Sequence, residues 1–460
     1  MSEGLGIYIS RSFIELSYKK SSHAYNGRMA YSLNSMESQL KTLIALSEAP
    51  LHQTEHIEVR TKLPWLVLER RIGSSPAFLT TSGFESWLDM NLPLGPEHWS
   101  TELKKTSSAL QKESVFGLNE RTSASGEIEQ ALQLSELEFM AEKLKMSEVS
   151  HVAIGFLHSQ KNPKHEKMAT SFFREKGFQV YASHEVSNDP EERPRFWTAI
   201  LNAYVAPFLK EKMELVQKTL VELGAKETST FYNGTSLKDA LSGTPVWLSP
   251  TQQFKTVEPS LYCGLEDFEL LADARAALPT DHPRRVMSPL GWMSGAGFSS
   301  ETLRPSPTQK LENNFWGALD WSLRGENESG PIALGRGVQP TVLDALAAQF
   351  DISKINGLED RLNEKVMKRI QDAFKAYSKS VASDTTPVHQ ILKSVAVAWV
   401  TQISQAGFLE KKKKLKLIGP LAPATFEILK SLKASSYFEL GDSQFFLSQL
   451  CKAQTKETVK

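Results

Sequence analysis

Val152-Ala-Ile-Gly-Phe-Leu157 is a short run with almost no polar side chains, which is typical of a strand buried inside a parallel sheet. A helical segment at residues 164–176 follows and ends at Gly177, a residue that adopts the left-handed conformation of a helix C-terminus without strain. Phe178-Gln-Val-Tyr-Ala182 then predicts the next strand. Strand, helix and strand in this order form a βαβ crossover, so the sequence predicts an α/β protein.

Further helices and strands are expected along the rest of the chain. Residues 7–18 alternate between apolar and polar side chains and predict two short strands around a tight turn. Helices are expected at residues 36–48, 195–222, 358–380 and 389–405, and a last strand at 415–418. Pro207 should kink the second of these helices or divide it in two, because proline removes a helical hydrogen bond and clashes with the preceding turn.

The domain organisation follows from the length of the chain and from this proline. A chain of 460 residues is too long for one compact core. A boundary at the proline gives a first domain over residues 1–205 and a second over residues 206–460. Residues 279–310 are rich in Pro, Ser and Gly, so we expect them to be largely loop.

The composition excludes several classes of protein. Lys plus Arg and Asp plus Glu both total 53, so charge gives no reason to expect a nucleic-acid or anionic-membrane partner. Cys263 and Cys451 are far apart, which speaks against a disulfide framework or a cysteine zinc site. The N-terminus lacks a signal-peptide pattern, and no apolar run reaches the ~20 residues of a membrane span. We therefore expect a cytoplasmic protein with no nucleic-acid and no membrane partner.

Two His-Glu pairs flank the predicted crossover helix, in Asn162-Pro-Lys-His-Glu166 and in Tyr181-Ala-Ser-His-Glu-Val186. Imidazole and carboxylate groups together suit a proton-transfer site. They also suit a divalent metal ion such as zinc or manganese, for which His165 and His184 would be the ligands.

A purely structural explanation competes with this site. Asn162 could cap the helix, with the next residue in its first turn and Glu166 in the capping pattern, and for these residues we favour that explanation. His184, Glu185 and Arg193 could instead form an ion-paired brace for the helix that follows. For His184 and Glu185 both interpretations remain open.

The same stretch resembles the A-subunit family of hydantoinases and 5-oxoprolinases. The residues that match its motifs, in order and spacing, are Asn162, Pro163, His165, Glu166, Ser183, His184, Glu185, Val186, Arg193, Leu201, Asn202, Ala203 and Tyr204. Three shorter stretches, at residues 78–88, 333–345 and 419–422, are also similar to segments of that family.

The resemblance implies an actin-like (ASKHA) fold, in which a pair of ribonuclease-H-type domains surrounds a central cleft. It implies a hydrolase that opens the C–N bond of a small cyclic amide and uses ATP with magnesium. It also implies a B-type hydantoinase subunit as partner, or a homo-oligomer. His184, Glu185 and Asn202 would then be the catalytic residues.

Two glycine-rich hairpins bind the nucleotide phosphates in this family, and the first departs from the family pattern here. Backbone amides cradle a phosphate only where no Cβ blocks the approach. Tyr8 replaces the family's Asp, and Ser10 and Arg11 replace two glycines, while Ser12 keeps a hydroxyl group.

The second hairpin, Tyr262-Cys-Gly-Leu-Glu-Asp-Phe-Glu269, departs in a similar way. One glycine remains as Gly264, and Glu266 would point a carboxylate at a triphosphate and repel it. Gly419 stands where the last strand of these proteins turns towards the nucleotide. Ser12, Gly264 and Gly419 are the cofactor-binding residues that the resemblance leaves, so we expect impaired use of ATP and magnesium.

Two functions are consistent with this pattern, and a third possibility is ligand chemistry without ATP that uses the cleft and the His/Glu cluster, for which the sequence names no substrate. The chain is either a hydrolase of cyclic amides with impaired ATP use, or a catalytically inactive homologue, a pseudoenzyme, that acts as a binding or scaffold subunit. The two hypotheses differ in whether nucleotide binds.

Overall fold

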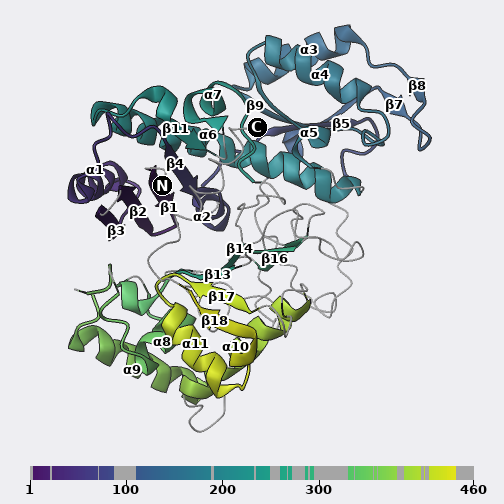
Figure 1. The fold of residues 1–460 in the computed structure, drawn as a ribbon. Coiled ribbons are helices and arrows are strands. Elements are labelled where there is room, and N and C mark those ends of the chain that lie inside the picture. Colours follow the sequence, from purple (N-terminus) through teal and green to yellow (C-terminus); the bar gives the residue numbers. More distant parts are fainter. Residues whose placement is uncertain are drawn as a thin grey trace.

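The computed structural model describes residues 4–20, 23–70, 72–87, 110–187, 191–232, 235–248, 260–266, 268–271, 285–288, 291–294, 330–335, 337–355, 357–359, 361–380, 388–405, 409 and 414–441. Within these ranges, none of the helices combines the length and the hydropathy that a membrane crossing needs. Figure 1 shows three parts, with the described elements from β13 to β18 below the two sheets formed by earlier residues.

A six-stranded sheet, in the order β12-β11-β4-β1-β2-β3, forms the first part. The strands β1, β2 and β3 form an antiparallel meander. On the other side of β1, β4 pairs with β1 in parallel, and β11 pairs with β4 in parallel. Leu5, Ile7 and Ile9 of β1 face the apolar cluster beneath the helices, as the period of a strand dictates. The elements are β1 (Gly4–Ile9), β2 (Phe13–Lys20), β3 (His23–Ala30), α1 (Met36–Ser47), β4 (Ile57–Thr61), α2 (Leu63–Arg70), the short helix η4 (Glu227–Ser229), β11 (Thr230–Tyr232), β12 (Thr235–Ser236) and α7 (Leu237–Ser242).

A second, parallel sheet is inserted between β4 and β11, in the order β10-β9-β5-β6. It confirms the predicted βαβ crossover, and Gly177 has the positive φ of 89° expected after the helix. The elements are β5 (Ala77–Thr81), η3 (Lys112–Ser114), β6 (Val115–Leu118), the hairpin strands β7 (Arg121–Thr122) and β8 (Ile128–Gln130), α3 (Leu134–Met146), β9 (His151–Gly155), α4 (Lys164–Glu175), β10 (Gln179–Ala182) and the single turn α5 (Ser183–Val186).

One long helix, α6 (Glu192–Glu222), joins the two sheets. It contacts β9 and β10 of the parallel sheet as well as α1, α2 and α7 of the first part. Pro207 lies inside α6 and does not divide it, and Ala206 before it and Leu209 after it are both buried in the core. The domain limits 1–205 and 206–460 stay a prediction. The apolar cluster to which α6 belongs extends to Leu248, and apart from Phe13 the cluster of the C-terminal part starts at Leu261.

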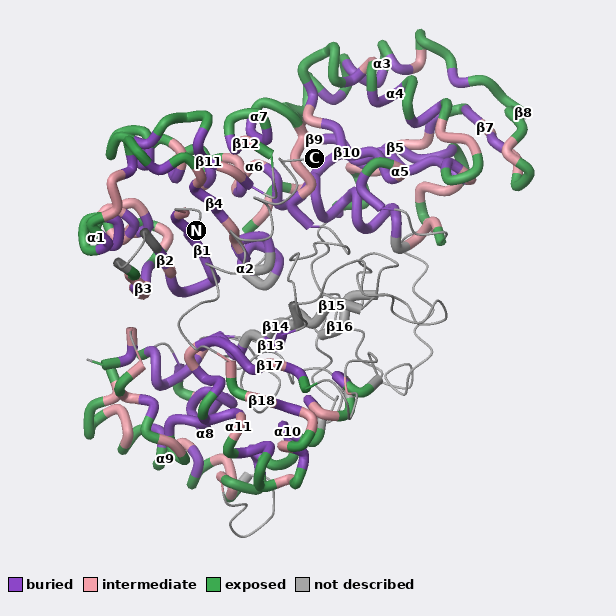
Figure 2. The backbone as a smooth tube through the Cα atoms, viewed as in Figure 1, coloured by how far each residue is buried: buried purple, intermediate pink, exposed green. Residues whose placement is uncertain are grey.

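The C-terminal part is built on a four-stranded sheet in the order β14-β13-β17-β18. An antiparallel pair is followed by two parallel strands, as in β2-β1-β4-β11 of the first sheet, so the two parts share one strand topology. Figure 2 shows β13 and β17 mostly buried, with α9 largely exposed on the outer side of this part. The elements are β13 (Ser260–Cys263), β14 (Phe268–Leu271), η5 (Ile332–Leu334), α8 (Val342–Gln349), α9 (Glu364–Ser380), α10 (Val388–Gln405), β17 (Leu415–Ile418), α11 (Ala422–Ser431), η6 (Ser435–Tyr437) and β18 (Phe438–Leu440).

Part of the stretch expected to be loop, residues 279–310, is paired in the structure. The strands β15 (Arg285–Ser288) and β16 (Gly291–Ser294) form an antiparallel hairpin. The other residues of this stretch lie outside the described ranges.

Candidate functional site

The turn between β1 and β2, residues 10–13, is closed by its own first side chain. The Ser10 hydroxyl oxygen accepts hydrogen bonds from the backbone N–H groups of Ser12 (3.4 Å) and Phe13 (2.9 Å). It donates in turn to the carbonyl of Phe13 (3.1 Å). Ser12, a sequence-predicted phosphate residue, is buried in this turn. We call these residues the first hairpin turn.

The first hairpin turn contacts the turn after β13, residues 264–266, which we call the second hairpin turn. Glu266 Oε2 accepts a hydrogen bond of 2.8 Å from the backbone N–H of Arg11, and the Arg11 guanidinium donates to the Glu266 carbonyl (3.2 Å). Arg11 Nε lies 4.0 Å from Glu266 Oε2. Each residue is only 3% exposed, so this is a buried ion pair between the N-terminal and C-terminal parts.

The contact between the two parts continues from Arg11 to Phe13. The Phe13 side chain packs in the apolar cluster of the C-terminal part, although Phe13 is the first residue of β2 in the first sheet. A Cβ atom on Gly357 would lie 3.4 Å from Cδ of Arg28 and 3.6 Å from Cε1 of Phe13. The first hairpin is therefore packed into the C-terminal part by apolar and ionic contacts together.

Gly264 and Gly419, the other two predicted phosphate residues, lie at one edge of the C-terminal sheet. Each directly follows a strand, and those two strands, β13 and β17, are parallel neighbours. Gly419 has a φ of 97°, which favours glycine, and the N–H of Leu421 donates to the carbonyl of Cys263 (3.0 Å). Ser12 and Gly264 thus belong to turns that touch, and Gly419 follows the neighbouring strand.

A second polar cluster surrounds Glu166 at the carboxyl edge of the parallel sheet. The buried carboxylate accepts hydrogen bonds from the N–H of Phe156 (2.8 Å), the Ser183 hydroxyl (2.7 Å) and the N–H of His184 (3.1 Å). Its Oε2 also lies 2.6 Å from Nδ1 of His184. Because an ionised carboxylate only accepts, Nδ1 is the donor in this contact, which leaves the lone pair of a neutral imidazole at Nε2.

His165 also pairs with a buried glutamate, but both of its ring nitrogens are hydrogen-bonded within the protein. Its Nδ1 lies 2.7 Å from Glu120 Oε2, and Glu120 also accepts a hydrogen bond from Thr81. Its Nε2 accepts the N–H of Leu132 (3.4 Å), so both ring nitrogens are used inside the protein. The side chain of His184, in contrast, is 12% exposed. To bind a ligand through Nε2, His165 would have to give up its hydrogen bond from the N–H of Leu132, whereas His184 would not lose such a bond.

The predicted pair of metal ligands, His165 and His184, is not assembled with further ligands. Within the described ranges, no group of three His, Cys, Asp or Glu side chains is placed to hold a metal ion. Each histidine instead has its own buried carboxylate, Glu120 or Glu166. The arrangement suits fixed imidazoles more than a shared ion.

The other two residues predicted to be catalytic have structural contacts. Glu185 forms an ion pair with Arg174 on α4 (2.7 Å). Asn202 is fully buried on α6, where its amide donates to the carbonyls of Thr198 and Leu248 (2.8 Å each). Its Oδ1 accepts the N–H groups of Trp247 and Leu248 (2.8 Å each). All the ordinary hydrogen bonds of the Asn202 amide are therefore made within the fold.

The predicted capping of the helix α4 is met in part by Asn162, whose side chain accepts the N–H of the first helical residue, and is wrong for Glu166. The N-cap of α4 is Pro163, without a side-chain cap. Asn162 Oδ1 accepts the N–H of Lys164 (3.2 Å), while Glu166 points to the strand ends rather than to the start of its own helix.

Fully buried Arg195, which sequence reasoning missed, donates to Ser183 (3.2 Å).

The Glu166 cluster lies near a point where ligands often bind. β6 lies on one side of β5 and β9 on the other, so the strand order reverses between β5 and β9. In open α/β sheets, crevices at the carboxyl ends of such strands are the usual ligand sites. Thr81, the last residue of β5, lies at this edge. Its Oγ1 accepts the N–H of Leu157 (3.1 Å), so these two polar groups at the strand ends are already paired with each other.

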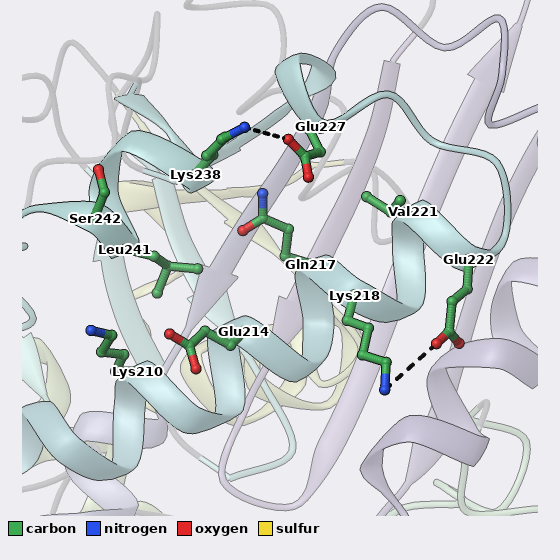
Figure 3. A pocket seen from close by; sticks show the side chains of 10 residues that line it. All are labelled: Lys210, Glu214, Gln217, Lys218, Val221, Glu222, Glu227, Lys238, Leu241 and Ser242. Carbon is green, nitrogen blue, oxygen red and sulfur yellow. Dashed lines mark hydrogen bonds and ion pairs between the residues drawn. The ribbon is translucent and has the colours of Figure 1, made fainter.

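A groove with a volume of about 700 Å³ lies between α6 and the segment from η4 to α7. Figure 3 shows the side chains that line it. Three lysines and three glutamates line it, and two pairs are formed, Lys238 with Glu227 (2.6 Å) and Lys218 with Glu222 (3.8 Å). The balanced charge selects neither an anion nor a cation. No residue of the groove belongs to the hairpin turns or to the Glu166 cluster.

Known proteins match parts of this chain. Residues 65–177 match the family model for the hydantoinase/oxoprolinase N-terminal region. An uncharacterised protein of Methanocaldococcus jannaschii is 29% identical over 140 residues, which are 30% of this chain and 21% of that protein. Caprolactamase subunit alpha of Pseudomonas jessenii is 32% identical over 87 residues (18% and 12%), and 5-oxoprolinase of Saccharomyces cerevisiae is 26% identical over 181 residues (33% and 14%). The matches thus span about a fifth or less of these relatives.

Solved structures match nearly the whole chain. ATP-dependent caprolactamase from Pseudomonas jessenii has a TM-score of 0.62 at 18% identity, over 98% of this chain and 70% of that one. Nucleotide-free acetone carboxylase has a TM-score of 0.56 at 15% identity, over 95% and 68%. At such identities the likeness shows the fold alone, which is the expected actin-like type. With the motifs between residues 162 and 204, these matches relate the chain to the hydantoinase/oxoprolinase family, whose N-terminal region residues 65–177 match, and to ATP-dependent hydrolases of cyclic amides.

Proposed function

We propose that this chain is a cytoplasmic A-type subunit that does not hydrolyse ATP and that binds a partner chain instead, either a B-type subunit or a second copy of itself. The observation that carries this proposal is the contact between Arg11 and Glu266. In the family the two hairpins hold the nucleotide phosphates between them. Here a carboxylate takes a backbone amide of the first hairpin turn, and a triphosphate would meet its negative charge.

Calorimetric titration of the purified chain with Mg·ATP and Mg·ADP tests this function. We expect no heat of binding at millimolar nucleotide and no release of phosphate. Magnesium-dependent binding in the micromolar range would contradict the proposal. Light scattering after size-exclusion chromatography, alone and with a purified B-type chain, tests the partner. A mass that stays that of one chain in both samples would rule out both proposed partners.

A second candidate function is ring opening of a small cyclic amide at the Glu166 cluster without ATP. The observation that favours it is the partly exposed His184, whose Nδ1 is fixed by a buried carboxylate so that Nε2 can accept a proton. We expect slow hydrolysis of 5-oxoproline, caprolactam or hydantoin that His184→Gln abolishes. His165→Gln is the matched control, because the same kind of pair is closed there. Equal rates for wild type and His184→Gln would exclude this candidate.

A further inference from the structure

The helix α3 carries apolar side chains on two opposite faces. The residues on its buried face are Leu137, Met140, Ala141 and Leu144. Phe139 and Met146 lie on the other face, where they are aligned because seven residues make about two turns of a helix. They are 69% and 87% exposed, whereas the outer face of a surface helix is ordinarily polar. We call these two residues the outer stripe.

The outer stripe is open to solvent. Figure 1 shows α3 on the outside of the part built on the parallel sheet, beside α4, which it contacts. Figure 2 shows exposed positions along its length. Leu134, at the start of α3, is also 51% exposed. Aromatic and methionine side chains are enriched in protein–protein interfaces, so a stripe of them on an outer helix favours a protein partner.

The charged residues on one flank of the outer stripe are used within the chain. Glu136 Oε1 accepts the backbone N–H of Asn119 (2.9 Å), and Lys143 Nζ lies 4.4 Å from the centre of the Phe116 ring. The opposite flank is therefore the one that can offer its charges to a partner.

This open flank makes α3 complementary to a second copy of itself. It carries Glu138 and Lys145, which are both exposed and have opposite charges. In two antiparallel helices related by a two-fold axis near Glu142, Glu138 of each copy lies opposite Lys145 of the other. The same axis places Phe139 opposite Met146 of the second copy, because both pairs are centred on that position. Two Glu142 carboxylates meet at the axis, each beside Lys145 of its own chain (3.5 Å), which offsets their repulsion.

We propose that two copies of this chain associate through α3, with the two helices antiparallel about an axis near Glu142. The inference rests on the proposed function, because it selects the second copy from the two partners given there and assigns a surface to it. One pair of 13-residue helices buries less than the ~1,200 Å² at which stable interfaces begin, so we expect a Kd on the order of 10 µM.

Sedimentation equilibrium of the full chain, at concentrations from about 1 to 200 µM, tests this inference on both sides of the expected Kd. Wild type should change from monomer to dimer as the concentration rises. Phe139→Glu should weaken the dimer at least about tenfold, because it places a charge in the apolar contact. Leu46→Glu is the matched control, since Leu46 is 58% exposed on a different helix, α1, and its substitution should leave the Kd unchanged.

An exchange of charges tests the antiparallel arrangement itself. Glu138→Lys and Lys145→Glu should each weaken the dimer about three- to tenfold, because each brings like charges together at two symmetric contacts. The double variant Glu138→Lys/Lys145→Glu should recover most of the wild-type affinity, since both pairs form again with their signs exchanged. A purely internal role of these residues would give no such recovery.

Three results would overturn the inference: a wild type that stays monomeric over this range, a Phe139→Glu dimer as tight as that of wild type, or a double charge variant as weak as both single ones. If wild type alone stays monomeric and Phe139→Glu abolishes its binding to a purified B-type chain, the outer stripe belongs to that partner and the second copy is excluded. Failure of the proposed function is a separate result, because that function fails if wild type binds Mg·ATP, whatever its mass.

Discussion

The carboxylate of Glu166 fixes the imidazole of His184, with Oε2 2.6 Å from Nδ1 and also within hydrogen-bond distance of the His184 backbone N–H. The two residues come from α4 and from the turn after β10, so this contact ties a covering helix to the edge of the parallel sheet.

Glu166→Gln should lower the free energy of unfolding by about 2 to 4 kcal/mol, because an amide in this buried place brings a donor against groups that already donate. Urea denaturation followed by circular dichroism measures the change. Glu185→Gln is the control, since its pair with Arg174 is largely exposed and should contribute less than about 1 kcal/mol. Equal losses for the two variants would show that the Glu166 contacts are not a main element of stability.

His151 should make the protein less stable in acid. Burial lowers the pKa of His151 from 6.5 to about 4. Between these two values the unfolded chain binds the proton and the folded chain does not, so stability falls as pH decreases from 6.5 to 4. His151→Gln should therefore reduce the drop in Tm between pH 7 and pH 5. His52→Gln, at an exposed position, should leave the drop as in wild type. An unchanged drop in His151→Gln would be evidence against this assignment.

Gly155 allows β9 to approach α6. A Cβ atom at this position would lie 2.5 Å from Cδ1 of Phe196, so Gly155→Ala should destabilise the fold by about 1 to 3 kcal/mol. Phe196→Leu in the same chain should recover part of that loss, because the contact is between these two side chains. Thermal melts of both single variants and the double variant measure the coupling. Strictly additive effects would mean that the strain arises elsewhere.

Asn202→Asp should destabilise the protein by about 2 to 4 kcal/mol without any ligand present. The carboxylate would face two backbone carbonyls to which the amide now donates. Asn34→Asp is the control, because Asn34 is exposed. If Asn202→Asp instead kept wild-type stability and changed only ligand binding, the predicted catalytic role of Asn202 would be favoured over the structural one.

The parts of the fold that local patterns encode could be predicted from the sequence. The apolar run before α4, the glycine after it and the strand that follows are signals within some 30 residues, and the structure has each of them. Glu166 shows the limit of such rules. A glutamate near a helix start fits a cap, but its carboxylate binds strand ends that only the folded sheet brings near.

The contact between Arg11 and Glu266 could not be derived from spacing, because 255 residues separate them. A signal was present, since two of the residues that depart from the phosphate-binding pattern, Arg11 and Glu266, carry opposite charges. Either hairpin turn alone contains a single charged residue and none of opposite sign. The complementarity of the two charges becomes visible only when the two turns are considered as neighbours across one cleft.

The burial of Phe13 in the C-terminal cluster has a consequence for the order in which the protein can fold. On a ribosome that adds about 5 to 20 residues per second, some 13 to 50 seconds pass between the synthesis of Arg11 and that of Glu266. During this interval the first sheet can form, but its leading hairpin has neither its ionic partner nor its apolar surroundings. The nascent chain therefore exposes an aromatic side chain beside a strand, a natural position for a chaperone to bind until synthesis is finished.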